Sequence, residues 1–148
     1  MCCETLNLIR QSKARYCRYI DSKQWKAFRD LFSPDASIQI IDTAGATMAQ
    51  FDNTDDFVKS AIDFIGAGQS IHQVHNEEFE QISGEQIEAI WSMEDYIVFP
   101  ATHHPPLVSV HGYGHYFETW RKSGNTWQIS KLQLRRSILE LVHRSEAQ

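Results

Sequence analysis

His72 and Asp95 are the residues of this sequence that most directly suggest acid–base chemistry. From Ile87 to Ile97 every second residue is apolar except Asp95, so a strand here would place that carboxylate in an apolar row. An unpaired buried carboxylate is costly, and Asp95 therefore requires a partner or a proton. If Ser83-Gly84 forms a two-residue hairpin loop, counting back along both strands places His72 opposite Asp95. A slip of one residue would separate the two, because side chains alternate faces.

A histidine backed by a carboxylate is suited to taking a proton from carbon. Imidazole has an ordinary pKa of about 6.5, so much of it is neutral and basic near pH 7. His72 is therefore the candidate base, and Asp95 is the candidate carboxylate that fixes its tautomer and stabilises the imidazolium. Loss of a proton α to a carbonyl and departure of hydroxide amount to dehydration, whereas return of the proton elsewhere amounts to isomerisation. Both reactions share an enolate, and both stay open.

The first half of the chain has the patterns that would position these groups from one side. Apolar residues recur at helical spacing, interrupted by capping and turn residues. The expected elements are a helix over 6–20, a second helix capped by Asp21-Ser22 and stopped by Pro34, strands over 37–41 and 46–51, and a third helix that begins at Asn53-Thr54 and ends at Gly66 or Gly68.

The second half predicts long strands. After the hairpin of 71–97, three prolines between Phe99 and Leu107 indicate an exposed loop that can serve as a rim or lid. Strands over 108–120 and 127–141 follow, joined by the turn Ser123-Gly124-Asn125, and residues 143–148 are expected to form a frayed tail. This order predicts a single α+β domain over 1–148, with helices on one face of a strongly bent sheet.

The strand over 108–120 carries further candidate binding residues. His111, Tyr113 and His115 share one face, and Gly112 and Gly114 share the other. The three side chains are candidate substrate contacts, with plain sheet packing as the alternative. Trp91, in the row of Asp95, is a fourth candidate contact, although the tryptophans of this chain can equally fill the core or an oligomer interface.

Two further questions concern arginine and metal. Arg135 and Arg136 alternate faces, so one of them could point inward as the partner of an anion, although a surface salt bridge is the favoured prediction. The histidines show no HExxH or similar spacing, so no metal site is predicted.

Composition limits the classes of function. The 148 residues are 42% hydrophobic, enough for one core, and the formal charge of −5 with a pI of about 5.8 argues against nucleic acid as a partner. Neither a membrane-spanning run nor a signal peptide is evident, so the expected location is the cytoplasm. Cys2, Cys3 and Cys17 form no CxxC pair, and reduced thiols are expected.

Three stretches resemble the SnoaL-like branch of the nuclear transport factor 2-like (NTF2-like) superfamily. They are ARYCRYIDSKQWKAFRDLFSPDA, SIHQVHNEEFEQISGEQIEAIWSMEDY and GYGHYFETWRKSGNTWQISKLQLRR. They are most similar to the dehydratase-type members, which include the bile acid 7α-dehydratase and scytalone dehydratase families. The resemblance implies a cystatin-like cone, in which three helices and a curved, mixed, mainly antiparallel sheet enclose an apolar pocket. It also implies chemistry without a metal or organic cofactor, and a homodimer or homotrimer formed through the sheet face.

The catalytic pattern of the dehydratase-type members is matched at Tyr16, Asp21, His72 and Asp95. The resemblance implies that Tyr16 donates a hydrogen bond to the oxyanion or the leaving group, and that Asp21 positions His72 or accepts from the substrate. Each has a simpler interpretation, because Asp21 is a natural N-cap for the second helix and a tyrosine in an amphipathic stripe is commonly a core residue.

Together these observations predict a dehydratase-type lyase that acts on a hydrophobic, cyclic hydroxy-carbonyl molecule. A ketosteroid-isomerase-like isomerase, a polyketide cyclase and a non-catalytic binding or association module stay as alternatives. The surroundings of His72 distinguish enzyme from module, because a catalytic histidine must open onto a cavity.

Overall fold

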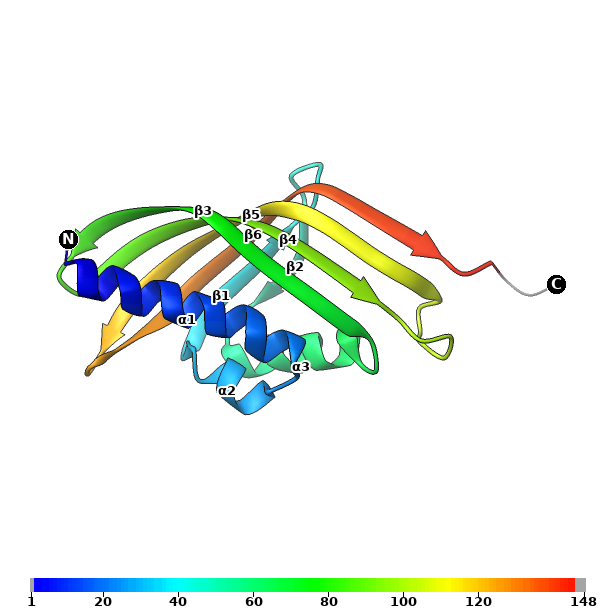
Figure 1. Ribbon diagram of the computed structural model, residues 1–148, viewed down its shortest axis with the longest axis horizontal. Helices are drawn as coiled ribbons and strands as arrows, with labels where there is room; N and C mark the ends of the chain where they lie inside the picture. The colour runs from blue at the N-terminus through cyan, green and yellow to red at the C-terminus, as the bar shows by residue number, and fades with distance from the viewer. Residues whose placement is uncertain (1, 146–148) are drawn as a thin grey trace.

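Three helices pack on one face of a curved six-stranded sheet in the computed structural model, which describes residues 2–145 (Figure 1). The predicted α+β class and the mixed, mainly antiparallel sheet are confirmed, since only the pairing of the first and last strands is parallel. The elements are α1 (Cys3–Asp21), α2 (Trp25–Arg29), β1 (Phe32–Ile41), β2 (Thr47–Phe51), α3 (Thr54–Ile65), β3 (Gln69–Ser83), β4 (Gln86–Val98), β5 (Leu107–Ser123) and β6 (Thr126–His143).

The sheet has the strand order β2-β1-β6-β5-β4-β3. The four long strands β3 to β6 form a meander, and the short β1–β2 hairpin joins it by placing β1 parallel to β6. In Figure 1 the helices lie together beneath the concave side of these strands. The space between helices and sheet is therefore where the core and any cavity must form.

The second helix is shorter than its sequence pattern predicts. It covers Trp25–Arg29, with Gln24 at the N-cap, and the chain is already in β1 at Phe32. Pro34 lies inside β1, at the point where the pairing with β6 shifts register, so its missing N–H interrupts no regular ladder. The prediction that Asp21 caps this helix is wrong, because Asp21 is the last residue of α1.

The β3–β4 hairpin places His72 opposite Asp95, as the sequence predicts. The turn itself lies one residue later than expected, at Gly84-Glu85, with Ser83 paired to Gln86. The pairing regains the predicted register because it shifts twice along the hairpin, once beside the turn and once near Asn76, which has a positive φ of 53°. The predicted pairing is thus correct, although the predicted turn is not.

Apolar side chains of the helices and of the concave sheet face form one core. The row predicted on β4 is buried along its whole length, including Asp95. The α3 helix begins as predicted, since the side chain of Asn53 accepts a hydrogen bond from the backbone N–H of Asp56, and it ends before Gly66, whose φ is +52°.

The loop between β4 and β5 is held against the end of the last strand. The side chain of Arg144 donates to the backbone carbonyl of Phe99 at 2.7 Å, and its backbone N–H donates to that of Pro106 at 2.8 Å. Residues 143 and 144 are therefore not frayed as predicted, and 146–148 lie outside the described residues.

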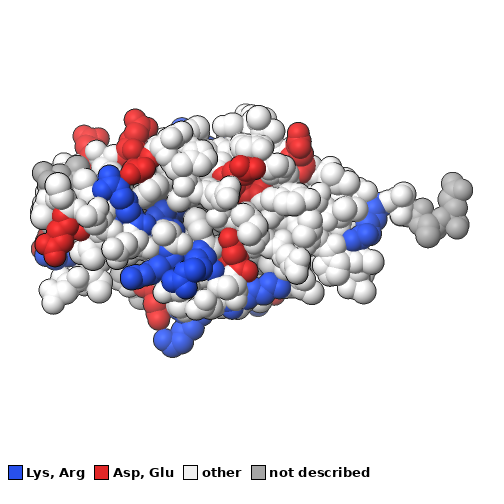
Figure 2. Space-filling model, viewed as in Figure 1, with Lys and Arg blue, Asp and Glu red and all other residues white. Residues whose placement is uncertain are grey.

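Acidic and basic side chains both occur on the face shown in Figure 2, and several basic side chains gather in its lower middle. Within residues 2–145, no helix is both long enough and apolar enough to cross a membrane.

Candidate functional site

A cavity of about 390 Å³ lies between the helices and the concave face of the sheet. Its walls are mostly apolar side chains from α1, α3 and every strand of the sheet. The polar side chains that line it are few: Tyr16, Ser60, His72, Asp95, Tyr116 and Arg136. This combination of an apolar space with a small polar group is typical of sites for hydrophobic small molecules.

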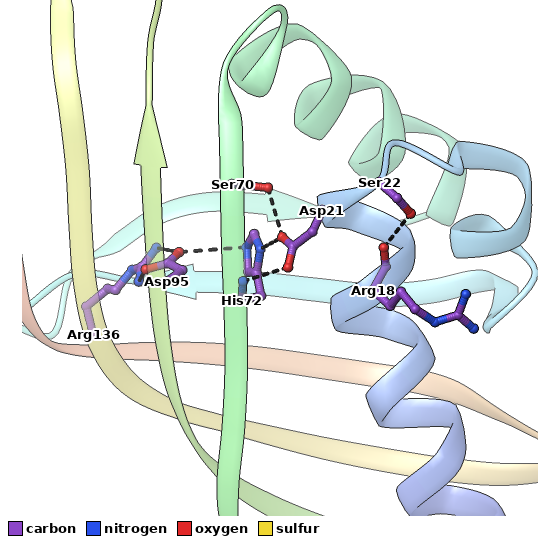
Figure 3. Close-up of polar contacts among 7 residues, drawn as sticks. All are labelled: Arg18, Asp21, Ser22, Ser70, His72, Asp95 and Arg136. Atoms are coloured by element: carbon purple, nitrogen blue, oxygen red, sulfur yellow. Dashed lines mark hydrogen bonds and ion pairs between the residues drawn. The ribbon is translucent and has the colours of Figure 1, made fainter.

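Asp21 makes several short polar contacts with His72, which lines this cavity. One oxygen of Asp21 accepts from the Ser70 hydroxyl at 2.8 Å and lies 2.6 Å from Nδ1 of His72, while the other accepts from the His72 backbone N–H at 2.8 Å (Figure 3). A carboxylate at Nδ1 favours the tautomer in which that nitrogen carries the proton. Nε2 of His72 is then left with a free lone pair and can act as a base.

Asp95 is paired with Arg136 rather than with His72. The guanidinium donates two parallel hydrogen bonds to the carboxylate, at 2.5 and 2.8 Å, whereas Nε2 of His72 is 3.9 Å from the nearer Asp95 oxygen. Figure 3 shows the His72 ring between the two carboxylates. The sequence-based prediction that Asp95 fixes the His72 tautomer is therefore wrong in its geometry, because Asp21 occupies that position.

Arg136 is the arginine of the Arg135-Arg136 pair that points inward and lines the cavity. A surface salt bridge was the favoured prediction, but the side chain is almost buried and points toward Asp95. Burial disfavours the charge of Arg136, yet the hydrogen bonds and charge of Asp95 outweigh it and raise the pKa of the guanidinium above its usual value. The guanidinium is consequently charged at neutral pH.

Gly112 provides the space for this ion pair. It lies opposite Asp95 on the neighbouring strand, and a Cβ at this position would be 2.7 Å from Oδ1 of Asp95 and would overlap the Arg136 guanidinium. Only glycine leaves that volume free. The need for glycine at this position thus comes from a close approach of side chains.

Two tyrosines complete the polar part of the cavity. Tyr16 on α1 and Tyr116 on β5 have ring centroids 5.7 Å apart, in an edge-to-face arrangement. Burial raises the pKa of Tyr16 above its usual value and that of Tyr116 well above it. Both phenols therefore stay protonated and can donate hydrogen bonds. Tyr116 was not predicted.

His111, Tyr113 and His115 do share a face, but that face is the outer one. The cavity face of β5 carries the alternate residues, Gly112 and Tyr116 among them. On the outer face, Nε2 of His111 lies 2.7 Å from Oε1 of Glu94, and Tyr113 is 37% exposed. The prediction that these three residues line the cavity is wrong. Alternation shows that they share one face of the strand, but it does not show which face is buried.

Trp91 is buried and does not line the cavity, so the prediction that it contacts the substrate is wrong. Its indole N–H donates to Glu118 at 2.9 Å, and its ring packs edge-on against Phe79. The core alternative applies to it. Within the described residues, no group of three or more His, Cys, Asp or Glu side chains is arranged to hold a metal ion.

Residues 4–133 of the chain match the family described as the SnoaL-like domain. One relative is "Probable cyclase FGR4" of Gibberella zeae, with 30% identity over 145 residues that cover 94% of this chain and 95% of the relative.

Solved structures share the fold at lower identity. The "Putative Scytalone Dehydratase" of Novosphingobium aromaticivorans has a TM-score of 0.79 and 18% identity, with 97% of this chain and 91% of that chain covered. A hexachlorocyclohexane dehydrochlorinase, LinA type 2, has a TM-score of 0.76 and 13% identity, with coverage of 97% and 94%. These likenesses establish the NTF2-like fold, and the extent of the sequence match establishes the family: this chain belongs to the SnoaL-like domain family.

Proposed function

We propose that this protein is a cofactor-independent enzyme that takes a proton from a hydrophobic, cyclic hydroxy-carbonyl molecule and eliminates water from it. The observation that carries the proposal is the Asp21–His72 pair, because His72 belongs to the lining of an apolar cavity while Asp21 holds its Nδ1. A histidine sealed within the core would have favoured a binding module. The open histidine supports catalysis.

In the proposed reaction, Nε2 of His72 takes the proton from the carbon next to the substrate carbonyl. The electron pair of that C–H bond enters the enolate, whose oxygen is stabilised by hydrogen bonds from the phenols of Tyr16 and Tyr116. The enolate then reforms the carbonyl and expels the β-hydroxyl, which leaves as water with the proton from His72. Asp21 holds the imidazole and stabilises the imidazolium between these steps.

Asp95 receives a different role from the one that its spacing suggests. Bound to Arg136 and 3.9 Å from Nε2, its carboxylate holds the guanidinium against the cavity beside the imidazole. Both terminal nitrogens of Arg136 already donate to Asp95. Arg136 is the one permanent cation among the described lining residues, and Asp95 already neutralises its charge. The preferred substrate is therefore neutral rather than an acid.

A cyclase is the second candidate function. The relative from Gibberella zeae carries the name of a probable cyclase, and its match covers nearly all of both chains. The same proton abstraction would generate an enolate that attacks a second carbonyl carbon of its own molecule. A carbon–carbon bond forms, the π bond of that carbonyl breaks, and its oxygen takes the proton from His72 to become a hydroxyl. Isomerisation would need only the return of the proton. All three reactions begin with His72 as the base.

Proton abstraction can be tested without the natural substrate by using 1-tetralone, a neutral bicyclic ketone. The protein in deuterium oxide should accelerate exchange of the α-protons, measured by NMR. We expect His72→Gln to abolish the acceleration and the outer-face variant Tyr113→Phe to retain it. If His72→Gln exchanged the protons as fast as the parent protein, the assigned base would be wrong. Formation of water or a new ring from candidate hydroxy-ketones then separates lyase from cyclase.

A further inference from the structure

A fully buried ion pair lies beneath the polar part of the cavity. The ammonium of Lys13 on α1 donates to Oε1 of Glu118 on β5, and both side chains are 0% exposed. The other oxygen, Oε2, accepts from the indole N–H groups of Trp91 and Trp120, each at 2.9 Å. Glu118 is thus held on all sides and fixes the position of the ammonium.

The same ammonium lies over the rings of both cavity tyrosines. Nζ of Lys13 is 3.7 Å from the ring centroid of Tyr16 and 3.7 Å from that of Tyr116. An ammonium has three N–H donors, and here one carboxylate and two aromatic faces surround it. Helical spacing brings Lys13 to Tyr16, and strand alternation brings Tyr116 to the face of Glu118.

Stability alone gives little reason for such a pair. Desolvation of two charges offsets much of their attraction, and buried ion pairs are often replaceable by apolar residues without loss of stability. This energetically costly ion pair lies directly behind the two tyrosines that line the cavity. Lys13 itself does not reach the cavity lining. Tyr16 and Tyr116 are the cavity residues that Lys13 contacts directly.

We infer that Lys13, anchored by Glu118, is a positioning residue that fixes the rings of Tyr16 and Tyr116 so that their hydroxyls meet the oxygen of the substrate. The inference rests on the proposed function, because it concerns the groups that stabilise the enolate. Preorganised donors are effective only when their supporting contacts hold them in place. One ammonium group makes cation–π contacts with both rings and so fixes both of them.

The test uses 2-naphthol, whose ionised form imitates an enolate oxygen on an apolar body, and naphthalene, which lacks the oxygen. The variant is Lys13→Met with Glu118→Gln, because removal of Lys13 alone would leave a buried carboxylate without its partner. The amide introduced by Glu118→Gln keeps an oxygen that can accept from the indoles. The readouts are the dissociation constants of both probes and the absorbance of bound naphtholate at a fixed pH.

We expect the double variant to bind naphthalene as the parent does, but to lower the ionised fraction of bound 2-naphthol by about tenfold, the scale of a coupling between contacting residues. In a Tyr16→Phe/Tyr116→Phe background the same two changes should alter that fraction less than about twofold, because the phenols through which Lys13 acts are gone. Equal losses in both backgrounds, or an equal loss for naphthalene, would overturn the inference. Exchange of 1-tetralone protons tests His72 separately, so failure of the proposed function would be recognised by itself.

Discussion

The carboxylate of Asp21 holds both the backbone N–H and the Nδ1 of His72, although the two residues are 51 positions apart. The end of α1 is thereby fixed to β3 at the point where the imidazole enters the cavity. One carboxylate sets the position of the strand and the tautomer of its histidine together.

Asp21→Asn should consequently impair catalysis more than it impairs folding. An amide can still accept one hydrogen bond, but it cannot balance the imidazolium, and its NH₂ group can favour the wrong tautomer. We expect α-proton exchange of 1-tetralone to slow by on the order of 100-fold or more. Asp63→Asn, on the exposed side of α3, is the matched control and should keep the parent rate. Parent-like exchange in Asp21→Asn would contradict the role of Asp21.

Gly112→Ala should disturb the Asp95–Arg136 pair. The added methyl group would meet the guanidinium and Oδ1 of Asp95, so the pair must shift or part. We expect a loss of about 1–3 kcal/mol in the free energy of unfolding, measured by urea denaturation. Gly84→Ala is the control, since a Cβ there meets nothing within 4 Å. Equal stability of the two variants would show that the space above Gly112 is not needed.

Cys17 makes the stability of the protein depend on pH in the alkaline range. Burial raises the pKa of its thiol from 9.0 to about 11. Because the unfolded chain loses this proton first, the contribution is complete below pH 9.0 and is lost as the pH rises toward about 11. Unfolding measured between these values should show a steeper decline for the parent than for Cys17→Ala.

The thiols should also differ in reactivity. Cys2 and Cys3 are exposed, whereas Cys17 is buried. At about pH 8 we expect a thiol-specific reagent to modify the two exposed residues rapidly and Cys17 only after denaturant is added. Rapid labelling of Cys17 in the folded protein would contradict its described burial.

The outer face of the sheet carries exposed apolar residues, which fits the predicted homodimer or homotrimer. Ile71, Tyr96, Tyr113 and Ile138 are between 37% and 55% exposed. Tyr113→Asp with Ile138→Asp should shift the mass measured by light scattering to that of a monomer, because the charges would oppose burial of this face. Leu8→Asp, an exposed apolar residue on α1, should leave the mass unchanged. A monomeric parent protein would refute the predicted assembly.

Local patterns predicted most of the fold and part of the site. The alternation in β4 identified a buried row with an acid in it, and the hairpin count brought His72 to Asp95. The partners of these residues come from distant segments. Asp21 reaches β3 from the end of α1, and Arg136 reaches Asp95 from β6. Residue spacing along one strand or helix does not predict contacts between side chains of distant segments.

The wrong prediction for three residues of β5 has a similar cause. Alternation correctly grouped His111, Tyr113 and His115, but alternation alone does not say which group faces inward. Three polar aromatic residues suggested a binding surface. The residues that face the cavity are those of the other face of β5, where Gly112 makes room for the Asp95–Arg136 pair and Tyr116 lines the cavity.

The strand order has a consequence for how this protein is made. Among the described strands β6 is synthesised last, yet it lies in the interior of the sheet and separates β1 from β5. Until it is inserted, the β1–β2 hairpin has no neighbour in the meander, and Asp95 has no guanidinium. Folding of the nascent chain must therefore finish with a long-range insertion, which topology makes slow. The cavity would then be completed in one late step, so a nascent chain that lacks β6 would contain His72 without the closed cavity around it.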